Sequence, residues 1–544
     1  MNGYSKKYFS IIFFAIFIGV YALVLLINPQ LGPTDDFIFL RTLQADKPLL
    51  YYSQDFPYYD AVKLGRFTPL AGMEYNLFGL LSKSPSPLWY FFFHTIQFII
   101  FAVLIVKLIR KFTSDKLLIY GIPILLFLTP GFTISWFRMQ MNERNVIFFL
   151  AAFFLCYLAY LDKRKIIYFI SAILFANFAI YYKETAFIAI GAFAFFHFVF
   201  SRKISDKRVK ILDGSLALSS FLYAAIYYFY VYLHRGSNVY GGTNFNLLAF
   251  IKNFLNYGFF SDPIIILVLL PLTVWRIYKL FVRKQEAHPI LDSMMITGSV
   301  YASAFFILNM YGPYYLLPVY LFAIPTIIYF FSQNEQKNII LKGLLLASGF
   351  VLLFNTIPSG IYYLTYYKYL PINFNKTLDF LIQDINFKYL SGQANIFMDG
   401  VGRGNGRGAY FVLAEFLQYK GLTANRFDLK SNSENETHFS LISKIPVPFT
   451  VFQNDKPDEI KSGDYLIVSP QNSKNVNEEY LQSLSNNYEL AFRTKSALAF
   501  PNINLKALAK YFLLKRMSEG QKSSDIIINK NLTEWPDYYV FVKK

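Results

Sequence analysis

The chain has 544 residues, of which 55% are hydrophobic and 20% aromatic. Only 16% are charged, and with a mean hydropathy of +0.35 this composition excludes an ordinary soluble domain. The formal net charge of +18 would indicate a nucleic-acid partner in a soluble protein, but loop charges that orient a membrane protein account for much of it. The single cysteine, Cys156, lies in an apolar run and rules out an intrachain disulfide framework. We therefore predict a polytopic α-helical membrane protein.

Eleven apolar runs are long enough for membrane spans, which take about 20 residues each. They cover residues 8–27, 88–109, 117–134, 145–161, 166–182, 185–200, 211–233, 263–281, 293–310, 313–331 and 339–357. The first run lacks a small-residue cleavage site, so we expect a retained span rather than a signal peptide. The region 166–200, split by Lys183-Glu184, is also compatible with one re-entrant feature. Two spans are preferred because the loop charges then alternate consistently.

Basic clusters occur in every second loop. These clusters are Lys6-Lys7 and the segments 107–116, 162–165, 202–210 and 276–284. The positive-inside rule places them in the cytoplasm. The loops of the other parity then face outward, namely 28–87, 135–144, 183–184, 234–262 and 311–312. An odd number of spans predicts a cytoplasmic N-terminus and an extracytoplasmic C-terminus in the plasma (inner) membrane.

The chain changes character near Pro371, where it becomes polar and mixed in pattern. Strand-like runs at 394–398 and 465–468 alternate with helix-like runs at 409–419 and 505–516. We predict a transmembrane domain over 1–371 and a small extracytoplasmic α/β domain over 372–544.

The outward loops hold an unusual share of the charges that lie close to the membrane. These residues are Asp35 and Asp36 after the first span, Arg66 and Glu74 later in that loop, Arg138, Glu143 and Arg144 in the second loop, and Lys183-Glu184 in the third. His94 lies about two turns into the second span. Acids and bases from separate spans can therefore converge on one cleft at one membrane surface.

Each of these residues also has a structural explanation. Asp35 or the preceding Thr34 can cap a helix, and Arg138 and Arg144 can be anchors at the interface. Lys183-Glu184 can form a structural ion pair, and His94 can hydrogen-bond between helices. Their joint occurrence on one face favours a functional site, because several independent structural roles would otherwise have to coincide there.

This set of side chains suits glycosyl transfer from a polyprenyl-phosphate sugar. A carboxylate takes the proton from the acceptor hydroxyl as it attacks the anomeric carbon. Arginine and lysine stabilise the departing lipid phosphate, whose negative charge grows in the transition state. A lipid donor also needs a groove between spans, so such a site lies at membrane level.

The arrangement resembles the GT-C superfamily of membrane glycosyltransferases, particularly the relatives of protein O-mannosyltransferases. In those enzymes an acidic pair follows the first span, which matches Asp35-Asp36. An Arg-x-x-Pro-Leu element and an apolar Leu-Phe-Gly precede the second span, which matches 66–70 and 77–79. The match covers roughly residues 1–260, and residues 372–544 match no family that we can name.

The resemblance implies roles for several residues. Asp35 or Asp36 would be the catalytic base, and Arg66 and Lys183 would meet the lipid phosphate. A histidine in the second span and a Lys-Glu before a later span match His94 and Lys183-Glu184. An acidic residue opens the fourth span in the family, and either Glu143 or Asn145 takes that place here. We expect Arg66, His94, Arg138, Glu143, Lys183 and Glu184 to bind substrate.

A glycine-rich segment, 399–408, lies between a strand-like and a helix-like run of the C-terminal domain. Gly404, Gly406 and Ala409 fit the G-x-G-x-x-A form of a dinucleotide fingerprint, but the expected extracytoplasmic location argues against a nucleotide. Backbone amides together with Arg403 and Arg407 would instead hold an anionic glycan or phosphate. A plain flexible turn is the alternative.

The sequence thus predicts an integral-membrane hexosyl- or pentosyltransferase acting on the extracytoplasmic face. The expected partners are membrane lipid, a polyprenyl-phosphate sugar donor and a glycan, lipid or protein acceptor, with no nucleic acid. A divalent cation is compatible with the sequence, which identifies no metal ligands. A transporter or flippase of lipid-linked sugars, or a glycan polymerase or ligase of another fold, remains as an alternative.

Overall fold

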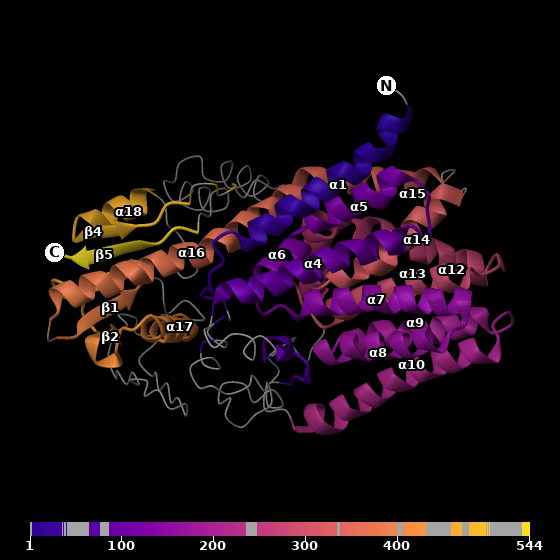
Figure 1. Ribbon diagram of the computed structural model, residues 1–544, viewed down its shortest axis with the longest axis horizontal. Coiled ribbons are helices and arrows are strands. Elements are labelled where there is room, and N and C mark those ends of the chain that lie inside the picture. Colours follow the sequence, from indigo (N-terminus) through magenta and orange to yellow (C-terminus); the bar gives the residue numbers. More distant parts are fainter. Residues whose placement is uncertain are drawn as a thin grey trace.

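Most of the chain forms a bundle of apolar helices, which continues into a small sheet at one end (Figure 1). The computed structural model describes residues 3–34, 36, 40, 65–76, 86–234, 247–333, 338–390, 392–399, 406–430, 458–470, 478–496, 498, 500 and 536–544. The helices of the bundle are α1 (Gly3–Leu26), α4 (Pro87–Ile109), α5 (Lys116–Phe127), α6 (Pro130–Phe137), α7 (Asn142–Lys163), α8 (Ile166–Tyr182), α9 (Ala186–Ser201), α10 (Lys207–Ile226), α11 (Leu247–Asn256), α12 (Leu270–Phe281), α13 (Pro289–Ile307), α14 (Tyr320–Gln333), α15 (Ile339–Val351) and α16 (Ile357–Lys388).

Within the described residues, seven helices are long and apolar enough to cross a membrane, and the protein is an integral membrane protein. The bent pair α5 and α6 adds an eighth span if it is counted as one. Three shorter apolar helices cover Ile166–Tyr182, Ala186–Ser201 and Leu317–Ser332. Every expected run therefore lies on helix, while the count of eleven spans stays a prediction.

One expected run is broken into two helices, and the expected division of 166–200 into two helices is present. The run 117–134 bends by 63° between α5 and α6, where Pro130 lacks the N–H needed to continue the helix. Thr129 caps α6 by accepting a hydrogen bond from the Phe132 N–H at 3.4 Å. The region 166–200 forms two helices, α8 and α9, because Lys183 adopts an extended backbone between them.

Small residues let the helices approach closely, as is typical inside membranes. A Cβ added at Gly360 of α16 would lie 1.8 Å from the Leu128 carbonyl oxygen, beside the break between α5 and α6. A Cβ at Gly191 of α9 would lie 3.0 Å from the Ser220 Cβ of α10. A larger side chain at either glycine would force the neighbouring helices apart.

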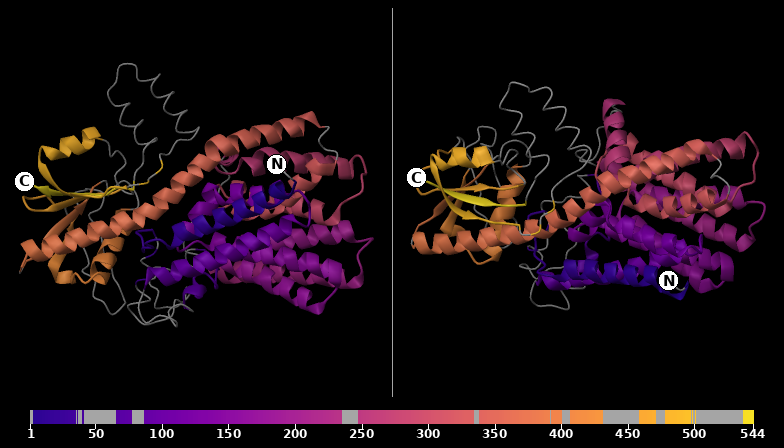
Figure 2. Two further views of the ribbon diagram at one scale, coloured as in Figure 1. Left: turned by 45° about the horizontal axis from the view of Figure 1, so that its top comes forward. Right: turned by 90° about the horizontal axis from the view of Figure 1, so that it is seen from above.

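The long helix α16 carries the chain out of the bundle and along the C-terminal sheet (Figure 2). Residue 371, where we expect the domain boundary, lies inside this helix, so the two parts share an element. The division into 1–371 and 372–544 stays a prediction. The N-terminus and the sheet lie at opposite ends of the bundle (Figure 1), and the orientation of both relative to the cytoplasm also stays a prediction.

The C-terminal part contains a mixed sheet with strand order β2-β1-β3-β5-β4. Its strands are β1 (Ala394–Met398), β2 (Phe427–Lys430), β3 (Tyr465–Val468), β4 (Tyr488–Arg493) and β5 (Tyr539–Lys543). β1 runs parallel to β2 and β3, whereas β5 runs antiparallel to β3 and β4. The expected strands match β1 and β3, and the expected helix 409–419 lies in α17 (Gly406–Tyr419). The short α18 (Glu478–Ser485) precedes β4, and the expected helix 505–516 lies outside the described residues.

Hydrogen bonds from Asn373 join α16 to the last part of the chain. Its Nδ2 donates to Ser496 Oγ at 2.8 Å and to the Pro536 carbonyl at 2.7 Å. Burial raises the pKa of the neighbouring Asp537 carboxyl, and hydrogen bonds from Ser496 oppose this rise. Phe374 packs edge-on against Phe416 of α17, with ring centroids 5.0 Å apart. The C-terminal part thereby buries one side of this stretch of α16, whereas Lys376 and Asp379 on the other side are exposed.

Candidate active site

Asp36 lies at the end of the bundle that faces the sheet. Its side chain is only 5% exposed, and Oδ2 accepts a hydrogen bond from the Gly32 N–H at 2.7 Å. A Cβ on Gly32 would lie 3.0 Å from Pro371 Cγ of α16, so this turn sits directly against that helix. Asp36 is thus a buried carboxylate held by its own turn.

Arg138 reaches the same helix from the connection between α6 and α7. Its guanidinium carbon lies 5.7 Å from the ring centroid of Tyr367. Tyr367 and Pro371 are four residues apart and share one face of α16. That face therefore brings the Asp36 turn and Arg138 close to each other.

Arg144, at the start of α7, is the most heavily bonded side chain at this end. It is 1% exposed, and its Nε donates to Gln97 Oε1 at 2.9 Å. Its Nη2 donates to the Tyr75 hydroxyl at 2.8 Å, and its Nη1 lies 3.3 Å from His94 Nδ1. Since a guanidinium only donates, His94 Nδ1 accepts and the ring proton sits on Nε2. Arg144 is therefore a buried structural hub and not an exposed anchor.

The contacts of His94 agree with its structural explanation, which is a hydrogen bond between helices. Its Nε2 lies 3.1 Å from the Tyr75 hydroxyl, which in turn donates to the Met139 carbonyl. Burial raises the pKa of the Tyr75 phenol, so this hydroxyl stays neutral. His94 helps to hold the segment 73–76 against α4 and α7.

Glu74 is bound by two helices, α7 and α8. Oε1 accepts from Asn145 Nδ2 at 2.6 Å, and Oε2 accepts from the Tyr182 hydroxyl at 3.0 Å. Arg144 Nη2 lies 3.7 Å from the same carboxylate. Asn145 is thus a neutral partner of an acid, and Glu143 is the acidic residue that opens α7.

The adjacent residues Lys183 and Glu184 do not pair with each other, contrary to the structural explanation considered above. Lys183 forms an ion pair with Glu143, and both are more than nine-tenths buried. The Lys183 ammonium also lies 4.8 Å from the ring centroid of Tyr315. Glu184 pairs instead with Arg66, at 2.5 Å between Oε1 and Nε. The two pairs tie the α8–α9 turn to separate neighbours.

Several expected site residues lie outside the described part of the chain. These are Asp35, Arg403 and the Leu-Phe-Gly element at 77–79. Arg407 belongs to α17, but its side chain is not among those described. The glycine-rich segment therefore stays a prediction as an anion site.

The sequence analysis missed Tyr75, Gln97 and Tyr182 as members of this network. Gln97 lies three residues after His94, so both share one face of α4, and that spacing was the available signal. Tyr75 follows Glu74 directly, and only the turn of the segment 73–76 makes both side chains reach α7. Among the described residues, no three histidine, cysteine, aspartate or glutamate side chains form a group that could hold a metal ion.

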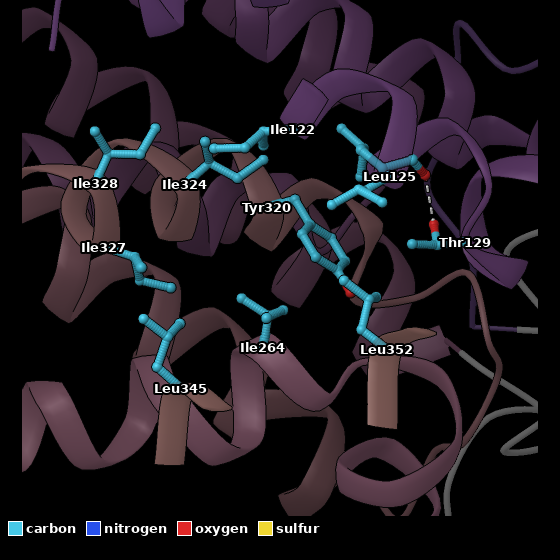
Figure 3. Close-up of a pocket in the computed structure, with 11 residues that line it drawn as sticks. Ile122, Leu125, Thr129, Ile264, Tyr320, Ile324, Ile327, Ile328, Leu345 and Leu352 are labelled. Carbon is cyan, nitrogen blue, oxygen red and sulfur yellow. Dashed lines mark hydrogen bonds between the residues drawn. The ribbon is translucent and has the colours of Figure 1, made fainter. Parts of the chain in front are cut away.

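An apolar cavity of about 180 Å³ lies deeper in the bundle, among α5, α14, α15 and the π-helical stretches before α12 and α16 (Figure 3). Its lining is aliphatic apart from Thr129 and Tyr320. Thr129 begins α6, whose other end carries Arg138. The cavity thus lies one short helix away from the Asp36 end of the bundle.

No known protein family matches the chain, and no curated protein matches it either. Solved structures do match, and two of them are oligosaccharyltransferases of Archaeoglobus fulgidus. The Archaeoglobus fulgidus oligosaccharyltransferase, tethered with an acceptor peptide containing the NVT sequon, is 13% identical, with 100% of this chain and 89% of that chain covered at a TM-score of 0.41. The Archaeoglobus fulgidus oligosaccharyltransferase AglB, in complex with an inhibitory peptide and a dolichol-phosphate, is 12% identical, with 99% and 89% covered at a TM-score of 0.38.

Both structures are archaeal oligosaccharyltransferases. At identities and TM-scores this low, the likeness carries no argument about chemistry. The function has to be argued from this chain's own residues.

Proposed function

We propose that the protein is a membrane glycosyltransferase that transfers a sugar from a polyprenyl-phosphate donor to a glycan, lipid or protein acceptor on the extracytoplasmic face. The observation that carries the proposal is that the turn of a buried carboxylate, Asp36, and the Arg138 guanidinium both lie against one face of α16. A base and a phosphate-binding cation at one membrane-level position are what this reaction needs.

In the proposed reaction, Asp36 accepts the proton of the acceptor hydroxyl while that oxygen bonds to the anomeric carbon. The bond between the anomeric carbon and the phosphate oxygen breaks, and polyprenyl phosphate leaves with the electron pair. Arg138 donates hydrogen bonds to the leaving phosphate, since a guanidinium fork matches phosphate oxygens. No step of the proposal uses a divalent cation.

Arg66 and Lys183 contribute less directly in this proposal than the resemblance implies. Each is already paired with a carboxylate, Glu184 and Glu143 respectively. A donor phosphate would have to compete with that partner for hydrogen bonds. We therefore assign Arg66 and Lys183 to shaping and charging the site.

The apolar cavity of Figure 3 suits the chain of the donor. Isoprenoid units have no polar atoms, and its aliphatic lining offers no hydrogen-bonding competitors. Its place beyond α6 lets a lipid chain extend into the bundle while the phosphate stays near Arg138.

The test is transfer by the purified protein with synthetic polyprenyl-phosphate sugars in detergent. The expected result is release of polyprenyl phosphate together with a glycosylated acceptor, and no reaction with nucleotide sugars. Detergent removes sidedness, so a transporter gives no product under these conditions. Movement of lipid-linked sugar across vesicles without any transfer would contradict the proposal.

A further inference from the structure

A second cavity, of about 450 Å³, opens at the end of the bundle opposite Asp36. It lies among the last turns of α7, α9 and α14 and the first turn of α13. Half of its lining is apolar, including Phe112 and Leu161. Its polar lining residues are Arg164, His197, Ser201, Ser205, His288 and Tyr329.

A buried network orients His197 in this cavity. His197 Nδ1 lies 2.8 Å from Asp213 Oδ2 and 2.7 Å from the Tyr157 hydroxyl, which donates to Asp213 Oδ1 at 2.6 Å. All three side chains are almost fully buried. Since Nδ1 donates to this pair, Nε2 is the ring nitrogen left for a ligand. Such a carboxylate–imidazole pair fixes the tautomer and the ring orientation.

Ser201 supplies the independent observation that points to a ligand. It follows His197 by four residues on α9, so both lie on one helix face. Its side chain is 1% exposed and lines the cavity, yet its Oγ has no hydrogen-bond partner within the described residues. A buried hydroxyl without a partner costs free energy unless something bonds to it.

The charges around the cavity select an anion. Arg164 Nε is held by Asp206 at 3.0 Å and its Nη1 by the Tyr160 carbonyl, which leaves Nη2 without a partner among the described residues. Four exposed neighbours in sequence are basic, namely Lys163, Lys165, Arg202 and Lys203. The nearby acids Asp162, Asp206 and Asp213 are already paired, and Glu286, two residues before His288, is exposed.

We propose that this cavity binds a phosphate monoester, with Arg164 Nη2 and Ser201 Oγ donating hydrogen bonds to its oxygens and His197 Nε2 accepting one from the P–OH group of its monoanion. A guanidinium and a hydroxyl match the oxygens of a phosphate, and the unprotonated ring nitrogen matches its remaining proton. The apolar half of the lining accommodates a carbon chain attached to it. The ester comes either from solution or from a lipid headgroup, since the cavity lies at the end of the membrane helices. The site is separate from the proposed transferase centre.

The experiment uses the full chain in nanodiscs and two probes. Glycerol phosphate is titrated calorimetrically, and native mass spectrometry counts phosphatidic acid retained against phosphatidylcholine, which has no phosphate monoester. Binding of glycerol phosphate indicates the soluble source, and retention of phosphatidic acid alone indicates the lipid source.

The variants are His197→Gln and Ser201→Ala, with His234→Gln, at an exposed residue, and Ser215→Ala, at a half-buried one, as controls outside the cavity lining. Loss of a hydrogen bond to a charged group predicts binding that is about 10- to 100-fold weaker in each cavity variant and unchanged in the controls. If His197→Gln does not fold, Ser201→Ala still tests the proposed phosphate binding, because this variant removes only the hydroxyl. Binding of neither probe, or wild-type affinity in Ser201→Ala, would overturn the proposal.

Discussion

At the scale of single residues, the buried ion pair between Lys183 and Glu143 sets a clear expectation. Removing one partner leaves an uncompensated charge in the protein interior. Lys183→Met should therefore lower the free energy of unfolding by about 3–5 kcal/mol. The measurement is thermal unfolding of the purified protein in detergent.

Two comparisons isolate the cause of that loss. The double variant Lys183→Met with Glu143→Gln removes both charges and should recover much of the stability. Lys111 and Asp162 form a pair of 2.6 Å with both side chains about half exposed, and Lys111→Met should cost less than about 1 kcal/mol. An equal loss in the free energy of unfolding for Lys183→Met and Lys111→Met would show that burial of the Lys183–Glu143 pair does not cause the loss.

Asp36 carries the sharpest prediction for activity. Asp36→Asn keeps the shape and the bond to the Gly32 N–H, because the amide oxygen still accepts, but an amide cannot take a proton. Sugar transfer should fall about 100- to 10,000-fold with normal expression, measured as product formed by the purified protein. Asp35→Asn is assayed in parallel.

The control is Asp115→Asn, since Asp115 caps α5 by accepting from the Leu117 N–H at 2.8 Å and lies exposed. It should leave transfer unchanged. Full activity in both Asp35→Asn and Asp36→Asn would show that neither aspartate is the catalytic base and that the two have a structural role.

The sequence predicted where the site residues gather but not how they pair. Loop parity places Asp36, Arg138 and Lys183 at one membrane surface, and that reasoning needs no tertiary contacts. The partners depend on backbone direction instead. Lys183 is extended (φ −153°, ψ 129°), so its side chain and that of Glu184 point to opposite sides and meet Glu143 and Arg66.

At the scale of helices, contact between α16 and the α5–α6 break depends on Gly360. A Cβ there would lie 1.8 Å from the Leu128 carbonyl oxygen, so Gly360→Ala forces backbone apart. The expected loss of stability is about 1–3 kcal/mol, measured by thermal unfolding in detergent. Gly349→Ala on α15 has nothing within 4 Å of the new Cβ and should not destabilise the protein.

The donor-chain cavity yields a matched pair of variants on α15. Leu345 lines the cavity, whereas its neighbour Leu346 is 67% exposed. Leu345→Trp should fill the cavity and raise KM for long polyprenyl donors while sparing a donor with one or two isoprene units. Leu346→Trp should leave the KM unchanged for long and for short donors. An equal effect of Leu345→Trp on the KM for short and long donors would show that the polyprenyl chain binds outside this cavity.

Helix boundaries were predictable where proline or charge marks them, as at Pro87 and Lys163. The 63° bend at Pro130 was not predicted, because hydropathy averages across it. Nor does hydropathy reveal that α16 continues beyond Pro371 to Lys388. The part of α16 after Pro371 is amphipathic, and the C-terminal part of the protein stabilises it by packing on it. Only the tertiary structure shows this packing.

At the scale of the whole molecule, strands β1 and β3 could be predicted as short apolar runs between turns. Their central place in the sheet order could not, because β5 comes from the last residues of the chain and inserts between β3 and β4. Such pairing over long sequence separation leaves no local signal in the sequence.

The last prediction concerns orientation, on which the proposed site depends. The basic loops predict that the end bearing Glu286 is cytoplasmic and that the sheet, with Asn486 exposed beside β4, is extracytoplasmic. In a Cys156→Ala background, Asn486→Cys should react with a membrane-impermeant maleimide on intact spheroplasts. Glu286→Cys should react only after permeabilisation. The reverse pattern would place Asp36 and Arg138 at the cytoplasmic surface, where an extracytoplasmic acceptor cannot reach them, and would exclude the proposed reaction on that face.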